Sequence, residues 1–352
     1  MLSIRYPAPL LAGGRIAITA PSAGVEASMQ LRLELCIEGL RTQGFVVEEG
    51  ECLRRQQQDT SAPAEVRAAE LMHYLLRDDI GAIIPPWGGE LAIELLELLD
   101  WHALAHARPK WLLGYSDTST LQVALTLRLG WATAHGPCLM DLVAGQNDSL
   151  TARAMSALAT PAGGQFEQFQ SARWQARRTD FAIVPDVTYS LTEPTHWRCL
   201  NRSAGNVVRF GGRLIGGCLD TLMHTAGTPY GDLRRFIADA GSDGVILYFE
   251  NAEQSPVDVV RALHRLRWAG WLDGVAGLVV GRSAAPDSQD KLGGTRLRYA
   301  DALKRMLAGL PCPVLIDVDI GHLPPQLVLI NGAKAQVSWS ESGGGRVVQA
   351  LT

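Results

Sequence analysis

The sequence predicts an α/β protein built around a parallel β-sheet with helices on both faces. Within the first 130 residues, short apolar segments alternate with amphipathic stretches, the order that produces a parallel sheet. The 352 residues, of which 47% are hydrophobic and 19% charged, suffice for two domains with sizeable cores. We therefore expect an N-terminal α/β domain over residues 1–160.

The elements of this domain follow from apolar periodicity and from its turns. Strands are expected over four short apolar segments, 16–20, 45–48, 82–84 and 111–113. Helices are expected over 28–44, 62–77, 90–99 and 118–129. In the first helix Leu31, Leu35 and Ile37 predict the apolar side, and Gly44 ends it.

Residues 161–209 show a looser pattern, which predicts a linker and an extended loop, and residues 210–352 form the expected C-terminal domain. Its strands are predicted over 214–217, 244–250, 277–280 and 314–318, and its helices over 256–269 and 299–307. Residues 327–337 read as a hairpin that turns at Asn331 and Gly332.

Composition and charge exclude several classes of function. The net charge of −4 and the absence of Lys or Arg runs give no basic face for a nucleic-acid polymer. No apolar stretch approaches the roughly 20 residues that span a bilayer, and no secretory signal is evident. The six scattered cysteines contain no C-x-x-C pair. We expect a cytoplasmic protein with reduced thiols and without membrane, metal or cofactor.

The segment Gly114–Thr118 indicates a nucleophile. It lies between a predicted strand and a predicted helix, so Ser116 projects its hydroxyl above the sheet. The backbone N–H of Asp117 then lies at the positive end of the helix, where an oxyanion binds. The motif departs from G-x-S-x-G because Thr118 replaces the second glycine. The alternative is that Ser116 or Thr118 only caps the helix.

A glycine turn after another predicted strand provides further backbone donors. In the segment Trp87-Gly88-Gly89, paired glycines let the backbone approach a ligand closely. A plain tight turn is the alternative. Ser22, in a similar turn, is a competing serine without an oxyanion partner of its own.

A serine nucleophile needs a base, and the base needs an acid that orients it. Among eight histidines, His322 follows a predicted strand and is held between Gly321 and a Leu-Pro-Pro segment. Glu250 ends a strongly apolar strand, where a carboxylate requires a partner. A helix cap or an arginine would also satisfy Glu250. His135, in a loop after a short strand, is a candidate for lining the cleft.

Taken together, these segments resemble the LD-carboxypeptidase family of serine peptidases, and more closely its branch similar to the microcin C self-immunity peptidase. The resemblance covers most of the chain and includes the segments 85–90, 114–119, 134–137, 216–220, 227–230, 249–251, 276–282 and 319–322. It implies a triad of Ser116, Glu250 and His322. It also implies an oxyanion hole from the N–H groups of Asp117 and the Gly88–Gly89 turn.

The family also implies an architecture, namely a flavodoxin-like N-terminal domain, a smaller β-rich α/β C-terminal domain, a site between them and a homodimer. The branch implies hydrolysis of an amide next to an acidic residue in a peptidyl- or aminoacyl-nucleotide. Aromatic residues favour it: Trp87 beside the glycine turn, and Trp174, Tyr189 and Trp197 in the long segment, where one can stack on a purine or pack between domains. The alternatives are release of D-alanine from murein tetrapeptides and non-catalytic binding of a small molecule.

Overall fold

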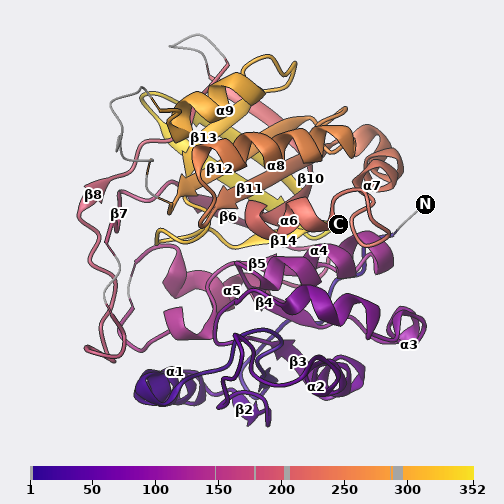
Figure 1. Cartoon of the computed structure of the whole chain (residues 1–352), viewed down its shortest axis with the longest axis vertical. Coiled ribbons are helices and arrows are strands. Elements are labelled where there is room, and N and C mark those ends of the chain that lie inside the picture. Colours follow the sequence, from indigo (N-terminus) through magenta and orange to yellow (C-terminus); the bar gives the residue numbers. More distant parts are fainter. Residues whose placement is uncertain (1–2, 147, 178–179, 202–206, 286, 288–295) are drawn as a thin grey trace.

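The computed structural model describes residues 3–146, 148–177, 180–201, 207–285, 287 and 296–352 (Figure 1). Two large sheets organise them. The N-terminal half forms the lower part of Figure 1, and the orange and yellow strands and helices of the C-terminal half lie above it. None of the helices in these ranges has the length and apolar run needed to cross a bilayer. All six cysteines are free thiols.

The N-terminal sheet has the strand order expected for a flavodoxin-like domain. Its parallel strands run in the order β2-β1-β3-β4-β5, and β14 adds to β5 in the antiparallel sense. The strands are β1 (Arg15–Ile18), β2 (Val46–Glu49), β3 (Ile80–Ile83), β4 (Trp111–Gly114), β5 (Thr133–His135) and β14 (Leu329–Asn331). The predicted parallel sheet is confirmed.

Helices cover both faces of this sheet. One face packs against α1 (Gln30–Thr42) and α5 (Ala154–Leu158), and the other against α2 (Ala64–Leu76), α3 (Trp101–His106) and α4 (Thr118–Leu129). The apolar side predicted for the first helix was partly wrong. Leu31 is exposed, because the buried stripe at helical spacing is Leu33, Cys36, Ile37 and Leu40.

The helix expected over 90–99 is instead a 3₁₀ helix, η2 (Ala92–Glu97). Asp100 accepts a hydrogen bond from the N–H of Ala103 and so starts a new helix, α3, immediately afterwards. A separate helix therefore begins at Asp100, and residues 92–97 form only the short 3₁₀ segment before it.

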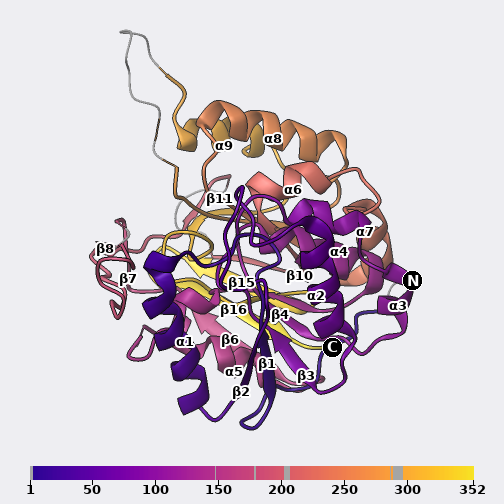
Figure 2. The ribbon, with the colours of Figure 1, turned by 60° about the horizontal axis from the view of Figure 1, so that its bottom comes forward.

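The C-terminal sheet is mixed. Its parallel centre consists of β10 (Val208–Cys218), β11 (Val245–Asn251), β12 (Gly277–Ser283) and β13 (Val314–Val318). The antiparallel strands β15 (Lys334–Ser340) and β16 (Gly344–Ala350) extend it beyond β10. The helices α6 (Leu219–Thr225), α7 (Leu233–Ala240), α8 (Pro256–Trp268) and α9 (Tyr299–Leu307) share one core with its parallel strands. Figure 2 shows α8 and α9 on the outside of the molecule.

The segment predicted as a linker contributes both edges of this sheet. β6 (Gln165–Phe169) pairs with β16, and β9 (Arg198–Cys199) pairs with β13. Between them, β7 (Arg173–Trp174) and β8 (Glu193–Pro194) pair with each other and project from one side of the molecule (Figures 1 and 2). The loop thus starts and ends in the C-terminal sheet.

The hairpin predicted over 327–337 was wrong. Gly332 makes a turn at φ +90°, but β14 before it joins the N-terminal sheet and β15 after it joins the C-terminal sheet. The Asn331 side chain anchors the crossing, because its oxygen accepts hydrogen bonds from the Gly216 N–H and the Tyr248 hydroxyl. This short segment ties the two sheets together.

Candidate active site

Ser116 lies in the turn between β4 and α4 with a left-handed backbone, at φ +61°. A non-glycine residue rarely adopts this conformation, and such strain is concentrated at functional sites. At the end of β10, the N–H of Cys218 donates to the Ser119 hydroxyl at 3.0 Å. The start of α4 is thereby held against the carboxyl end of the C-terminal sheet, where parallel strands place their working residues.

The structure brings Ser116, His322 and Glu250 together. Nδ1 of His322 lies 2.8 Å from Oε2 of Glu250, and Nε2 lies 3.0 Å from the hydroxyl of Ser116. Since an ionised carboxylate only accepts, Nδ1 donates to Glu250, and Nε2 is left to accept from Ser116. Glu250 is fully buried, whereas 12% of the His322 side chain is exposed.

The ionisation of Glu250 depends on its neighbours. Burial by itself raises the pKa of this carboxyl, but the charge and the hydrogen bond of His322 outweigh burial. The net result is a pKa below the ordinary value of a glutamate. Glu250 is therefore a carboxylate at neutral pH, able to fix the ring of His322 and to stabilise its protonated form.

Unused backbone donors lie in the serine turn and in the glycine turn beside it. A Cβ placed on Gly88 would lie 2.8 Å from both the Ser116 oxygen and the Asp117 nitrogen, so this turn abuts the serine. Within the described ranges, neither the N–H of Gly88, that of Gly89 nor that of Asp117 has a hydrogen-bond acceptor. These groups can therefore receive a negatively charged oxygen.

The side chain of Asp117 joins the serine turn to the glycine turn. One of its oxygens accepts from the Ser22 hydroxyl at 2.6 Å and from the Ala92 N–H at 2.7 Å. The N–H of Ala23 also donates to the carbonyl of Gly88 at 3.1 Å. Ser22, the competing serine of the sequence, is thus occupied in supporting the site.

Two cavities flank the ring of His322. The larger, of about 390 Å³, is lined by aromatic side chains, Trp87, Tyr115, Phe181 and Tyr189, together with Met29, Met140, Asp141 and Gln326 among others. The smaller, of about 100 Å³, is lined by Ser116, Asp117, Gly89, Cys218 and several carboxylates. A substrate whose scissile bond lies at Ser116 would extend into both.

Buried contacts hold the long loop over the larger cavity. Arg32 of α1 donates to the carbonyls of Pro185 and Val187, and its guanidinium lies 4.1 Å from the ring centre of Phe181. The hydroxyl of Tyr189 donates to Asp141 at 2.8 Å. The loop thereby supplies two of the aromatic walls.

Trp87, a predicted substrate contact, lines the larger cavity, and the structure places the other two predicted contacts away from both cavities. His135 is fully buried between the rings of Tyr115 and Tyr248, and burial lowers its pKa to about 4. Trp197 is 2% exposed, and its indole N–H donates to Asp319 at 2.9 Å. Neither lines a cavity beside Ser116, because each fills core space under the site.

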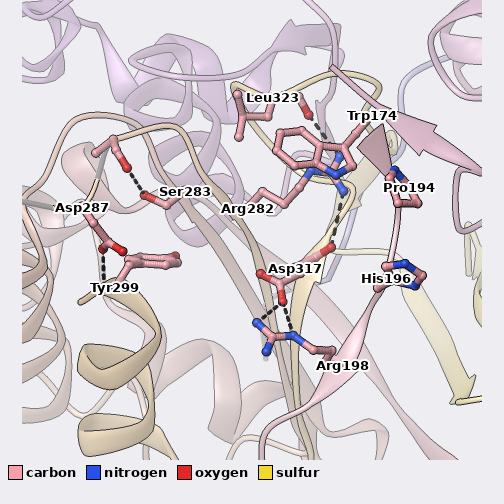
Figure 3. A pocket seen from close by; sticks show the side chains of 11 residues that line it. Trp174, Pro194, His196, Arg198, Arg282, Ser283, Asp287, Tyr299, Asp317 and Leu323 are labelled. Atoms are coloured by element: carbon pink, nitrogen blue, oxygen red, sulfur yellow. Dashed lines mark hydrogen bonds and ion pairs between the residues drawn. The ribbon is translucent and has the colours of Figure 1, made fainter. Parts of the chain in front are cut away.

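Arg282 lies in one of the segments that carry the family resemblance, but the sequence predicted no role for it. It lies near the end of β12, forms an ion pair with the buried Asp319 at 2.9 Å, and donates to the carbonyls of Leu323 at 3.1 Å and Pro325 at 3.3 Å. Figure 3 shows its guanidinium against the ring of Trp174, with hydrogen bonds to Leu323 and Asp317. Arg282 therefore fixes the loop that carries His322, and a buried arginine near the end of an apolar strand was the available signal.

Metal binding is an alternative role for some of the side chains around His322. Cys218, Glu250 and His322 have potential ligand atoms within 4.8 Å of one another. However, burial raises the pKa of Cys218 well above its ordinary value, which keeps the thiol protonated. Both ring nitrogens of His322 are also engaged by Glu250 and Ser116. The donor set does not fit a metal site.

Comparison with known families gives two matches in chain order. The model of the LD-carboxypeptidase N-terminal domain matches residues 16–136, and that of the LD-carboxypeptidase C-terminal domain matches residues 211–337. Both include parts of the arrangement described above, with Ser116 in the first and Glu250 and His322 in the second.

Relatives with assigned names align along most of the chain. A Streptomyces coelicolor protein named as a carboxypeptidase is 30% identical, covering 96% of this chain and 94% of its own. The microcin C7 self-immunity protein MccF of Escherichia coli is 25% identical, covering 94% and 92%. The murein tetrapeptide carboxypeptidase of Pseudomonas aeruginosa is 29% identical, covering 72% and 71%.

Solved structures share the fold. MccF in complex with glutamyl sulfamoyl guanosine superimposes with a TM-score of 0.79 at 23% identity, over 97% of this chain and 98% of that one. An MccF-like protein from Streptococcus pneumoniae in complex with AMP gives 0.76 at 24% identity, over 96% and 99%. These values establish a common two-domain architecture.

Proposed function

The chain belongs to the LD-carboxypeptidase family of serine peptidases, and we propose that Ser116, His322 and Glu250 are its catalytic triad. The observation that carries this proposal is the continuous chain of hydrogen bonds from Glu250 through His322 to Ser116. The unused N–H groups beside the serine hydroxyl support it. A protein that only bound a small molecule would need neither feature.

The geometry supports a two-step mechanism. Nε2 of His322 takes the proton of Ser116 as its oxygen attacks the scissile carbonyl, and Glu250 stabilises the imidazolium that forms. The N–H groups of Asp117 and of the Gly88 turn hold the oxyanion. His322 then gives the proton to the leaving amine. Water, activated by the same nitrogen, hydrolyses the acyl-enzyme.

For the substrate we propose an aminoacyl or peptidyl group joined to a nucleotide-like moiety. The support is the larger cavity, which His322 lines together with the aromatic side chains of Trp87, Phe181 and Tyr189, and to which we assign the leaving group. Stacking of a base on an aromatic side chain contributes about 1–3 kcal/mol. The named ligands of the MccF and MccF-like structures, glutamyl sulfamoyl guanosine and AMP, agree with this class.

The acidic acyl residue implied by the resemblance is less well supported. Its carboxylate would enter the smaller cavity, which Glu90, Asp220 and Glu253 already line. Like charges in such a space repel, so the lining weighs against an acidic residue at this position.

Murein tetrapeptides are the second candidate substrate. The Pseudomonas relative named as a murein tetrapeptide carboxypeptidase favours them. The same triad would then release a terminal D-alanine, and the larger cavity would receive a smaller leaving group than its volume allows.

The test compares both substrates with wild-type enzyme, Ser116→Ala, and Ser156→Ala as an exposed control. The substrates are a sulfamoyl adenosine conjugate and a murein tetrapeptide ending in D-alanine. Loss of the nucleophile should lower turnover by about 10⁶-fold. Cleavage of the conjugate by wild type and the control alone supports the proposal. Release of D-alanine alone supports the second candidate, and an active Ser116→Ala protein refutes the triad.

A further inference from the structure

One stretch of the long loop, residues 180–187, lies against the N-terminal domain although the loop starts and ends in the C-terminal sheet. The stretch falls between β7 and β8 in the chain. Its aromatic residue, Phe181, packs against the core that α1 shares with the N-terminal sheet, and it lines the larger cavity. The wall that Phe181 forms therefore depends on contacts between this stretch and the N-terminal domain.

Arg32 of α1 makes these contacts. Its Nη1 donates to the carbonyls of Pro185 at 3.0 Å and Val187 at 2.7 Å. Its guanidinium carbon lies 4.1 Å from the ring centre of Phe181, a distance at which a cation and an aromatic face attract each other. Within the described ranges, no other hydrogen bond joins residues 180–187 to the rest of the chain. The position of Phe181 is therefore set by Arg32.

This arrangement requires an arginine. Nε of Arg32 donates to the carbonyl of Met140, another residue that lines the larger cavity, at 2.9 Å. One planar group thus bonds to two separate backbone segments and presents its face to Phe181. A lysine has a single ammonium and cannot span these partners. Arg32 is 1% exposed, and because burying a charge is costly, a residue that only filled this space would be apolar.

The second aromatic wall of the loop is held separately. The hydroxyl of Tyr189 donates to Asp141 at 2.8 Å, and its backbone N–H donates to the side-chain oxygen of Gln146 at 2.9 Å. Neither bond involves Arg32. Loss of the Arg32 guanidinium should therefore displace Phe181 while Tyr189 keeps its place.

Arg32 has no part in the reaction itself. It is absent from the described residues that line the two cavities beside His322. None of its hydrogen bonds reaches Ser116, His322 or Glu250. A change at Arg32 should therefore alter binding of the group that lies against Phe181 and leave attack by Ser116 unchanged.

We propose that Arg32 is a positioning residue that gives the enzyme its preference for a bulky, planar leaving group. It acts through Phe181, whose ring it holds as one wall of the larger cavity. This inference rests on the proposed function, since it takes the larger cavity as the site of the leaving group. It adds a residue outside the cavity that decides between a nucleotide-like group and a small one.

The first experiment measures binding of the leaving group alone. Sulfamoyl adenosine is titrated calorimetrically into wild-type enzyme and Arg32→Met, and the rate at which a fluorophosphonate labels Ser116 is measured in both. We expect Kd to rise about tenfold in Arg32→Met, as for one lost stacking contact, and the labelling rate to change less than about twofold. Arg41→Met, on an exposed part of the same helix, is the matched control and should bind as wild type does.

A double-mutant cycle tests whether Arg32 acts through Phe181. Phe181→Leu alone should raise Kd about tenfold, and Arg32→Met/Phe181→Leu should bind no more weakly than either single variant, because both changes remove the same wall. Arg32→Lys should match Arg32→Met, since it keeps the charge but not the planar group. A roughly hundredfold rise of Kd in the double variant, or full recovery of binding with lysine, overturns the inference.

Steady-state hydrolysis separates positioning of the leaving group from general damage. For the sulfamoyl adenosine conjugate, Arg32→Met should raise KM about tenfold and keep kcat within about twofold of wild type. For the methyl ester of the same acyl group, whose leaving group is small, kcat/KM should stay within about twofold. Equal losses with both substrates, or a lower kcat alone, would contradict the assigned role.

Failure of the proposed function is distinguishable from failure of this inference. If wild type neither binds sulfamoyl adenosine nor cleaves the conjugate, the proposed substrate class is wrong and the inference falls with it. If wild type does both and Arg32→Met behaves identically, only the inference is wrong.

Discussion

Ser116 and His322 meet at one site but are positioned in different ways. Ser116 is set by consecutive residues, since β4, the strained turn and α4 follow one another in the chain. His322 depends on distant segments. Arg282 of β12 binds its loop, and Asp319 accepts from the hydroxyl of Ser171 at 2.6 Å and from the indole of Trp197.

The difference teaches where this active site is vulnerable. A nucleophile built into a strand–turn–helix unit is present whenever that unit folds. The base adopts its working position only when the long segment 161–209 and the C-terminal sheet are both in place, because Ser171 and Trp197 come from that segment. Substitutions far from Ser116 in sequence should therefore act through His322.

The largest effect should come from breaking the His322 half of the site. His322→Ala is expected to lower kcat by about 10⁶-fold and Glu250→Gln by about 10⁴-fold, because the first removes the base and the second its orienting acid. Steady-state hydrolysis measures both. His102→Ala, on the exposed side of α3, should retain full activity. Near-normal turnover in His322→Ala would contradict the triad.

The Ser116 half is tested by filling the space beside it. A methyl group at Gly88 would lie 2.6 Å from Cβ of Ser116 and 2.8 Å from the Asp117 nitrogen, which blocks the oxyanion position. Gly88→Ala should therefore lower kcat by about 10²- to 10³-fold. Gly309→Ala is a matched control, since its added Cβ meets nothing within 4 Å. Equal activities would place the oxyanion elsewhere.

Arg282 tests whether the base is held from a distance. Arg282→Met should lower kcat by roughly ten- to a hundredfold through displacement of the His322 loop. It should also lower the free energy of unfolding by about 3–5 kcal/mol, because the buried carboxylate of Asp319 loses its cationic partner and keeps only neutral donors. Arg261→Met removes an exposed pair with Asp258 and should change neither quantity appreciably. An unaltered kcat in a folded Arg282→Met protein would refute the positioning role.

The smallest effect concerns His135, the histidine that is fully buried near the site. Burial lowers the pKa of His135 to about 4 in the folded state, against about 6.5 when unfolded. As the pH falls below about 6.5, His135 takes up a proton in the unfolded chain but not in the folded protein. The free energy of unfolding therefore decreases until His135 is also protonated in the folded protein, near pH 4. Between pH 7 and 5, His135 should account for about 2 kcal/mol of this loss.

Urea unfolding of wild type and His135→Gln at both pH values measures this contribution. The variant should lose about 2 kcal/mol less than wild type between pH 7 and 5, whatever its absolute stability. His73→Gln, which removes an exposed histidine, should follow the wild-type dependence. An identical loss in wild type and His135→Gln would show that His135 is not protonated on unfolding.

The sequence predicted the parts of the molecule that depend on neighbouring residues. The bounds of α4, α9 and β13, the parallel sheet and the serine turn follow from local periodicity and turn chemistry, whereas the flavodoxin-like topology was implied only by the family resemblance. The branching of residues 329–340 into two sheets could not be predicted, because Asn331–Gly332 satisfies a hairpin equally well.

The sequence also could not predict which aromatic and charged residues lie in the core and which line the site. In the sequence, Trp197 looks the same whether its ring stacks on a ligand or fills the core. Its hydrogen bond to the buried Asp319 in the structure shows that it belongs to the core. The smaller cavity assembles Glu90, Asp220 and Glu253 from three separate segments. No local pattern connects them.

The most direct test of the central account identifies the residue that becomes covalently modified. Wild-type enzyme and His322→Ala are treated with a fluorophosphonate, digested, and analysed by mass spectrometry. We predict a single adduct on Ser116 in the wild type and strongly reduced labelling in His322→Ala, since the hydroxyl is then not activated. An adduct on Ser22 or Ser119, or equal labelling of Ser116 without His322, would contradict the account.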